Sequence, residues 1–365
     1  MHLSQILPSV FAGLGLSNAH DYLGCGASPS GREILFLIDG LGADAIATYQ
    51  DQIPVLAAAV NKGVVATSFP TTTATSLATL TTGAMPGTHG MLGYTVRVPR
   101  SGGRVLNSLK WDERVDPQIW QPMPTLFEQA AAAGITTSHV AAKRYEGSGF
   151  TRAVFRGAQY KGANIVSDLV AETVRALAQS PSFVYLYVND LDSAGHSDGV
   201  GSEKWLVALR GIDQLVAQLL ESVPKGTRIW ITADHGMINV QEKIIMGRDN
   251  SLLADVATIA GEPRMRHLYL TTESASAAQE LISRWESELG NKVSLFTRQR
   301  AIATGLFGEL VSPDAADRIG DVIAIARDNL VLLDPERADK EGEMIGHHGG
   351  DSLIESSVPL LLAQR

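Results

Sequence analysis

Four short runs of apolar residues, separated by helix-forming segments, define the pattern of this chain. Each run is almost continuously apolar, which is typical of strands buried on both faces of a mostly parallel sheet. The runs are EILFLIDG (33–40), SFVYLYVND (182–190), RIWITADHG (228–236) and VPLLLAQ (358–364). Segment 202–223 repeats apolar residues at three- and four-residue steps, and segment 124–134 lies between Pro124, which can start a helix, and Gly134, which can stop one. The pattern therefore predicts an α/β fold.

Residues 241–343 follow a different pattern. They carry more charge, one helix-like segment (273–290), and two short strand-like pieces (266–272 and 329–334). The region follows one histidine-bearing motif, TADHG, and precedes another, GHHGGDS. An insertion whose chain returns to the parent sheet would have this arrangement. We therefore predict an α/β core of residues 1–240 and 344–365, and an inserted cap or subdomain of residues 241–343.

Composition narrows the possible partners. The net charge of −9 argues against nucleic acid held by bulk electrostatics, although a metal centre would supply a positive site for a small anionic substrate. Cys25 is the one cysteine, so a zinc ion would need histidine and carboxylate ligands. Residues 1–24 have no basic start, and Pro8 and several glycines interrupt their apolar patch. We predict no signal peptide, no membrane span and a cytoplasmic location.

Acidic and histidine residues gather at the predicted strand ends. Asp39 and Asp234 each end a strand, where the carboxyl ends of parallel strands form the ligand crevice of an α/β sheet. Asp192 and His196 are four residues apart, so one helical turn can direct both side chains to one point. With His235 and one of the pair His347 and His348, the chain has three Asp and three His. This set suits two metal ions with about three protein ligands each.

A threonine-rich segment, residues 68–90, follows the first strand. It can present a Thr or Ser at a helix N-terminus, where backbone N–H groups favour an anion. A hydroxyl is a weak nucleophile near neutral pH unless a base or a metal activates it. Two metal ions nearby would activate such a hydroxyl, so we predict that this segment supplies the nucleophile.

In this order, the motifs resemble those of the alkaline phosphatase superfamily, and more closely its nucleotide pyrophosphatase/phosphodiesterase branch. The matching elements are Asp39, Thr73 upstream of TLTTG and PGTHG, Asp192-Ser-Ala-Gly-His196, Asp234-His235-Gly236 and Gly346-His347-His348-Gly349. The resemblance covers residues 33–351. It implies an alkaline-phosphatase-like three-layer αβα sandwich with a mostly parallel central sheet and an inserted cap.

The resemblance also implies roles for these residues. Asp192, His196 and His348 would bind one zinc ion, and Asp39, Asp234 and His235 would bind the second, with Thr73 as nucleophile. His347 is the competitor of His348, which directly precedes the Gly-x-Asp ending as the family's histidine does. Manganese or iron would also suit these ligands.

Two departures from the family pattern bear on the substrate. In the family's phosphodiesterases, the segment that starts at the nucleophile usually reads T-F-P-N. This chain has Thr73-Ala-Thr-Ser76 there, so Thr72 and Thr75 are alternative nucleophiles. The family has an asparagine that helps to hold a phosphoryl oxygen, and at the corresponding position this chain has Tyr94. The Tyr94 hydroxyl could donate the same hydrogen bond. Lys143 and Arg144 are the candidate basic residues for substrate binding.

The expected activity is hydrolysis of small phosphodiesters or nucleotide pyrophosphates through a covalent phosphothreonine intermediate on two zinc ions. No arginine lies beside the nucleophile to meet the extra charge of a monoester, which favours diesters. A phosphomonoesterase or a phosphonate hydrolase of the same superfamily is the alternative. An inactive binding homologue is disfavoured, because no ligand of the constellation is missing.

Overall fold

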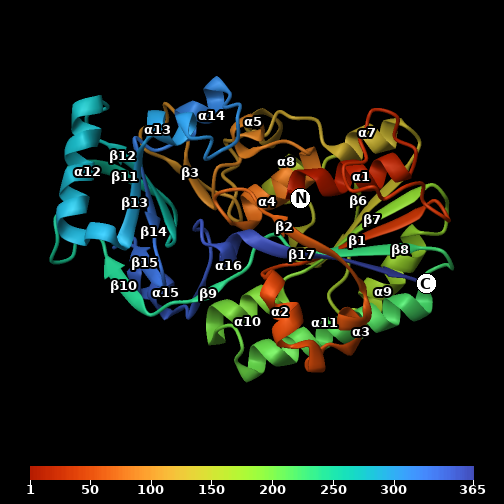
Figure 1. Cartoon of the computed structure of the whole chain (residues 1–365). Helices are drawn as coiled ribbons and strands as arrows, with labels where there is room; N and C mark the ends of the chain where they lie inside the picture. The colour runs from red at the N-terminus through yellow and green to blue at the C-terminus, as the bar shows by residue number, and fades with distance from the viewer.

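A seven-stranded, mostly parallel sheet forms the centre of the larger part of the molecule (Figure 1), in a computed structural model that covers residues 1–365. In sheet order the strands are β2 (Val60–Ala66), β17 (Ser357–Gln364), β8 (Arg228–Thr232), β1 (Arg32–Ile38), β7 (Ser182–Val188), β5 (Thr136–Ala141) and β6 (Gln159–Gly162). The strands from β8 to β6 are parallel, whereas β17 is antiparallel to both of its neighbours. The α/β fold with a mostly parallel sheet is confirmed.

Helices cover both faces of this sheet, giving three layers (Figure 1). Above the sheet in this view lie α1 (Ile6–Gly13), α4 (Thr73–Thr82), α7 (Leu126–Ala132) and α8 (Gly149–Val154). Below it lie α2 (Ala43–Thr48), α3 (Pro54–Ala58), α9 (Val166–Ala176), α10 (Asp190–Asp198) and α11 (Glu203–Ser222). The central strands are buried on both faces because these layers cover them, which explains their continuous apolar runs.

The start of α7 differs from the prediction. Thr125 caps this helix, and Glu128 completes a capping box, so Pro124 lies one residue before the cap and outside the helix. Gly134, with φ +80°, follows its end as predicted.

A second, smaller sheet is built entirely from residues within 241–343. It is antiparallel, with strands β11 (Val256–Glu262), β12 (Met265–Leu270), β14 (Val322–Ala326) and β13 (Val293–Thr297). Helix α12 (Ala275–Leu289) packs against it at the left of Figure 1. A cluster of 14 buried apolar residues lies wholly within this part, and the main cluster of 66 extends into it through residues such as Met265, Phe307 and Ile323. The predicted core-and-insertion boundaries stay a prediction.

Shorter elements connect these parts. The remaining strands are β3 (Thr95–Arg97), β4 (Val105–Asn107), β9 (Ile238–Asn239), β10 (Glu242–Ile245), β15 (Leu330–Leu333) and β16 (Gly346–His347). The remaining helices are α5 (Pro86–His89), α6 (Pro117–Trp120), α13 (Arg298–Ala303), α14 (Pro313–Arg318), α15 (Ala338–Glu343) and α16 (Leu353–Ser356). Single 3₁₀ turns are η1 (Leu3–Gln5), η2 (Gln50–Gln52), η3 (Lys143–Tyr145) and η4 (Gly290–Lys292). Strands β9 and β16 pair where the chain leaves the main core and where it returns. No helix has the length and apolar character needed to cross a membrane.

Candidate active site

Two groups of side chains meet beyond the carboxyl ends of the central strands. The first ligand group is Asp192, His196 and His348, and the second ligand group is Asp39, Asp234 and His235. Within each group, one nitrogen or oxygen atom from every residue lies within 4.8 Å of the others. These are the same two sets of three that the resemblance implies.

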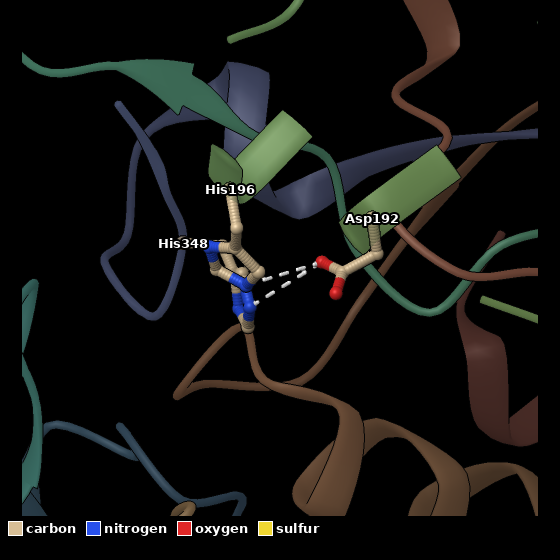
Figure 2. Close-up of side chains that lie close together, drawn as sticks. All are labelled: Asp192, His196 and His348. Carbon is tan, nitrogen blue, oxygen red and sulfur yellow. Dashed lines mark ion pairs between the residues drawn. The ribbon is translucent and has the colours of Figure 1, made fainter. Parts of the chain in front are cut away.

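The first ligand group combines one helix with a distant loop. Asp192 and His196 lie one turn apart on α10, and Nε2 of His196 is 3.4 Å from Oδ1 of Asp192. His348 comes from the loop after β16, and its Nε2 is 3.7 Å from the same oxygen. Figure 2 shows both imidazole rings turned toward the Asp192 carboxylate. His347 is buried but belongs to neither group, so His348 is the histidine that joins this one.

The second ligand group depends on the pairing of two neighbouring strands. Asp39 follows β1, and Asp234 and His235 follow β8, its parallel neighbour. Nε2 of His235 lies 3.4 Å from Oδ1 of Asp39 and 3.4 Å from Oδ2 of Asp234. All three side chains are buried.

Gly40 allows the two groups to approach each other. It has φ +78°, and a Cβ at this position would lie 3.1 Å from Cα of Asp192. Its backbone N–H also donates to Oδ1 of Asp234 at 3.2 Å. The turn after β1 therefore touches α10 and holds one oxygen of the second ligand group.

The backbone fixes the orientation of all three histidines. In each ring Nδ1 lies within hydrogen-bond distance of a backbone carbonyl: Gly346 for His196 (2.8 Å), Gly236 for His235 (3.0 Å) and Thr71 for His348 (2.9 Å). A carbonyl only accepts, so Nδ1 carries the hydrogen, and in the neutral ring Nε2 is then the nitrogen with the lone pair. Because Nε2 is the atom that faces the carboxylates, each ring is prepared to bind a cation.

Three carboxylate oxygens in these groups are buried and have no hydrogen-bond partner. They are Oδ1 of Asp39, Oδ1 of Asp192 and Oδ2 of Asp234. Burial, with the nearby Asp234 and Asp192 carboxylates, raises the pKa of Asp39 well above its usual range. A divalent cation in each group would neutralise these oxygens and use the histidine lone pairs. The residues therefore fit metal ions, and their N and O donors suit zinc, manganese or iron.

The candidate nucleophile lies beside the second ligand group. Thr73 is the first residue of α4, and its Oγ1 is 3.2 Å from Nε2 of His235. Thr73 is partly exposed, whereas the two alternatives, Thr72 and Thr75, are buried and make no contact of this kind. Among the three hydroxyls, Thr73 is the one that a substrate can reach beside these ligands.

The family model described as type I phosphodiesterase / nucleotide pyrophosphatase matches residues 34–351. The chain belongs to this family. The predicted branch of the alkaline phosphatase superfamily is thereby confirmed. The matched segment runs from β1 to the loop after His348 and contains every member of both ligand groups.

Known members of the phosphodiesterase family resemble parts of the chain. It is 26% identical over 220 residues to mouse ectonucleotide pyrophosphatase/phosphodiesterase family member 1, covering 56% of this chain and 24% of that protein. It is 23% identical over 233 residues to an uncharacterized pyrophosphatase/phosphodiesterase of Schizosaccharomyces pombe, covering 60% of this chain and 47% of that protein. The matches thus span less than half the length of these curated relatives.

Solved structures of the phosphodiesterase family share the fold. Murine ectonucleotide pyrophosphatase/phosphodiesterase 5 superposes with a TM-score of 0.70 at 16% identity, covering 90% of this chain and 87% of that one. The human protein 5 gives a TM-score of 0.70 at 17% identity, covering 91% and 87%. This likeness confirms the predicted alkaline-phosphatase-like αβα architecture.

The three predicted substrate-binding residues of this phosphodiesterase-family chain differ in position. Arg144 donates to the hydroxyl of Tyr145 at 2.8 Å and to Oδ1 of Asn189, the residue before α10, at 2.9 Å. The side chain of Lys143 packs over Gly162. Tyr94 is held through its backbone N–H, which donates to Oε2 of Glu262 at 2.9 Å, and no hydrogen bond joins its hydroxyl to either ligand group. Their roles in binding stay predictions.

Sequence reasoning missed Tyr187, which touches the second ligand group. Its hydroxyl donates to Oδ2 of Asp39, leaving Oδ1 free to face His235. The Tyr145 ring, on which Arg144 stacks, is 6.0 Å from the Tyr187 ring. The sequence signal that could have found it is a tyrosine near the end of the apolar run 182–190. This run forms β7, the other parallel neighbour of β1, so its end lies beside Asp39.

Proposed function

We propose that this chain is a metal-dependent phosphodiesterase and nucleotide pyrophosphatase. It hydrolyses small phosphodiesters or pyrophosphate-linked nucleotides through Thr73 and two divalent cations, which we propose to be zinc. The observation that carries this proposal is the Thr73 hydroxyl, 3.2 Å from Nε2 of His235, beside two ligand groups with unpartnered buried carboxylate oxygens.

Thr73 supplies the covalent step. Its Oγ1 gives up its proton to solvent and forms a bond to phosphorus as the bond to the leaving oxygen breaks, and the leaving oxygen takes up a proton from solvent. Water then attacks phosphorus, the bond from phosphorus to Oγ1 breaks, and a proton from that water restores the threonine hydroxyl. When bound, the two cations would stabilise the attacking and leaving oxygens and lower the pKa of water. The first turn of α4 directs backbone N–H groups toward a phosphoryl group next to Thr73.

A solved relative supports both the threonine and the substrate class. An inactive threonine-to-alanine variant of murine ectonucleotide pyrophosphatase/phosphodiesterase 5 is in complex with AMP. That protein shares the fold of this chain, with a TM-score of 0.69 at 16% identity. A nucleotide is therefore the substrate that we propose first.

Arg144 is the basic residue that we propose for binding an anionic part of the substrate away from the reacting phosphorus. Its guanidinium is exposed and held by Tyr145 and Asn189. Asn189 precedes the helix of the first ligand group, and Tyr145 neighbours the tyrosine that bonds to Asp39. A pyrophosphate has a second phosphate to offer such a residue, whereas a simple diester does not.

The test is hydrolysis of bis(p-nitrophenyl) phosphate and of p-nitrophenyl phosphate by zinc-loaded protein. We expect faster turnover of the diester, with a loss of about 10³-fold or more in Thr73→Ala and after chelation, because both remove the activated nucleophile. Thr72→Ala is the matched control, since Thr72 makes no side-chain capping bond to α4 and should retain activity. Preference for the monoester would refute the diester assignment, and activity surviving in Thr73→Ala would refute the nucleophile.

A further inference from the structure

A buried ion pair joins the insertion to the metal-binding end of the main core. Arg264 lies in the turn between β11 and β12, and Glu355 lies in α16, just before β17. Nε of Arg264 donates to Oε1 of Glu355 at 3.2 Å, and Nη2 donates to Oε2 at 2.9 Å. Both residues have 0% exposure, so water cannot take the place of either charged partner. The contact is bidentate and fixes direction as well as distance.

Glu355 connects this pair to both ligand groups. Its Oε1 accepts from the backbone N–H of Gly350 at 2.8 Å, two residues after His348. Its backbone carbonyl accepts from the N–H of Gly236 at 2.8 Å, one residue after His235. A single residue therefore restrains the chain next to one ligand of each group.

Thr71 continues the network to the ring of His348. Its Oγ1 donates to the carbonyl of Gly350 at 2.8 Å and accepts from the N–H of Gly349 at 3.1 Å. Its own carbonyl accepts from Nδ1 of His348 at 2.9 Å. Because Thr71 is two residues before Thr73, the same network reaches the start of the nucleophile helix.

The hairpin of the insertion also packs directly on the loop that carries His348. A Cβ added at Gly349 would lie 2.4 Å from Cγ of Glu262, and Gly349 has φ +118°. Glu262 accepts from the N–H of Tyr94 on its other side. The turn from Glu262 to Arg264 is therefore seated against this loop with no room for a side chain between them.

We infer that Arg264 and Glu355 are positioning residues for the metal site, through which the insertion holds His348 in the first ligand group. This inference rests on the proposed function only in that the site binds metal. The pair acts through backbone groups of the His348 loop and does not itself touch a metal or the substrate. Outer partners of this kind commonly set metal affinity by 10- to 100-fold.

The test is a zinc competition titration of the full chain with a chromophoric chelator, comparing wild type with Arg264→Met. We expect two zinc ions per wild-type chain. In the variant, one of the two should bind roughly 10- to 100-fold more weakly. Arg228→Met is the matched control, because Arg228 forms the buried pair with Glu33 at the opposite end of β1 and β8. It should lower the Tm and leave both zinc affinities unchanged.

A second measurement needs neither metal nor activity. In the zinc-free protein, hydrogen exchange of the peptide containing Gly349 and Gly350 should be faster in Arg264→Met than in Arg228→Met. Arg264→Lys keeps the charge but loses the bidentate contact, and should fall between wild type and Arg264→Met in both measurements.

Equal zinc affinity in Arg264→Met and Arg228→Met, with unchanged exchange of the loop, would overturn the inference. If wild type binds two zinc ions in the same titration, the proposed function would still stand. A wild-type protein that binds no zinc would overturn the proposed function and this inference with it.

Discussion

The two ends of strands β1 and β8 bury charged side chains in opposite ways. At the beginning of the strands, Nε of Arg228 donates to Oε1 of Glu33 at 2.7 Å, and Nε1 of Trp230 donates to its Oε2 at 2.8 Å. We call this the paired end. At the end of the same strands, Asp39 and Asp234 face each other with one unpartnered oxygen each. We call this the open end.

Both ends are buried, and they differ in whether the chain supplies a cation to the buried carboxylates. A buried carboxylate is tolerated when a cation neutralises it, and the paired end has its cation within the chain. The open end has histidine rings and the Tyr187 hydroxyl beside three carboxylates, and no lysine or arginine pairs with any of the three. In the function that we propose, a bound metal ion supplies the cation at the open end, which would separate a structural ion pair from a binding site on the same two strands.

The largest expected difference between the ends is in activity. Asp39→Asn removes a carboxylate ligand of the second group, and we expect hydrolysis of the phosphodiester to fall by about 10³-fold, or about 4 kcal/mol in the barrier. Glu33→Gln, the matched change at the paired end, should leave kcat within a few-fold of wild type. Initial rates of zinc-loaded proteins measure both, and equal losses would contradict the comparison.

The next effect is on stability, and here the larger loss is expected at the paired end. Arg228→Met leaves Glu33 buried without its cation, so we expect the free energy of unfolding to fall by about 3–4 kcal/mol. Asp39→Asn in zinc-free protein should not lower it, because that change removes an unneutralised charge. Urea denaturation of the two zinc-free variants provides the test, and a greater loss in Asp39→Asn would refute the assignment of the open end.

The smallest effect is on the pH dependence of the zinc-free protein. Burial raises the folded pKa of Asp39 above its unfolded value of about 3.9, so the folded state holds the proton more tightly. Stability from this group is therefore present below about pH 4 and is lost as the pH rises toward the folded pKa, by at most about 1.4 kcal/mol per pH unit. Asp39→Asn should flatten this slope. A wild-type slope unchanged in Asp39→Asn would contradict the predicted shift.

The central strands and the ligands could be predicted from sequence because their signals are local. Runs such as EILFLIDG are mostly apolar, and every candidate ligand except His348 lies at or just after such a run or one helical turn away. Strands β2, β5 and β6 were missed. Strand β2 is an exposed edge strand with Lys62 and Gly63, β5 has three hydroxyl residues and a histidine, and β6 is short and polar. A buried run also carries no sign of direction, so the antiparallel β17 could not be told from its parallel neighbours.

The site contacts that could not be predicted from the sequence join segments that are far apart along the chain. Arg264 and Glu355 are 91 residues apart, and Tyr187 and Asp39 are 148 apart. Neither pair belongs to a motif, and only the fold brings the partners together. The choice between His347 and His348 depended on a short ending in the sequence, and the geometry of the first ligand group agrees with it.

The central claim is that the open end holds metal ions in two separate groups of three ligands. Its most direct test is the zinc content per chain after equilibrium dialysis, measured by mass spectrometry for wild type, Asp39→Asn and Asp192→Asn. We predict two zinc ions in wild type and one in each variant, because each change disables one group. No bound zinc in wild type, or two ions retained in both variants, would contradict the account.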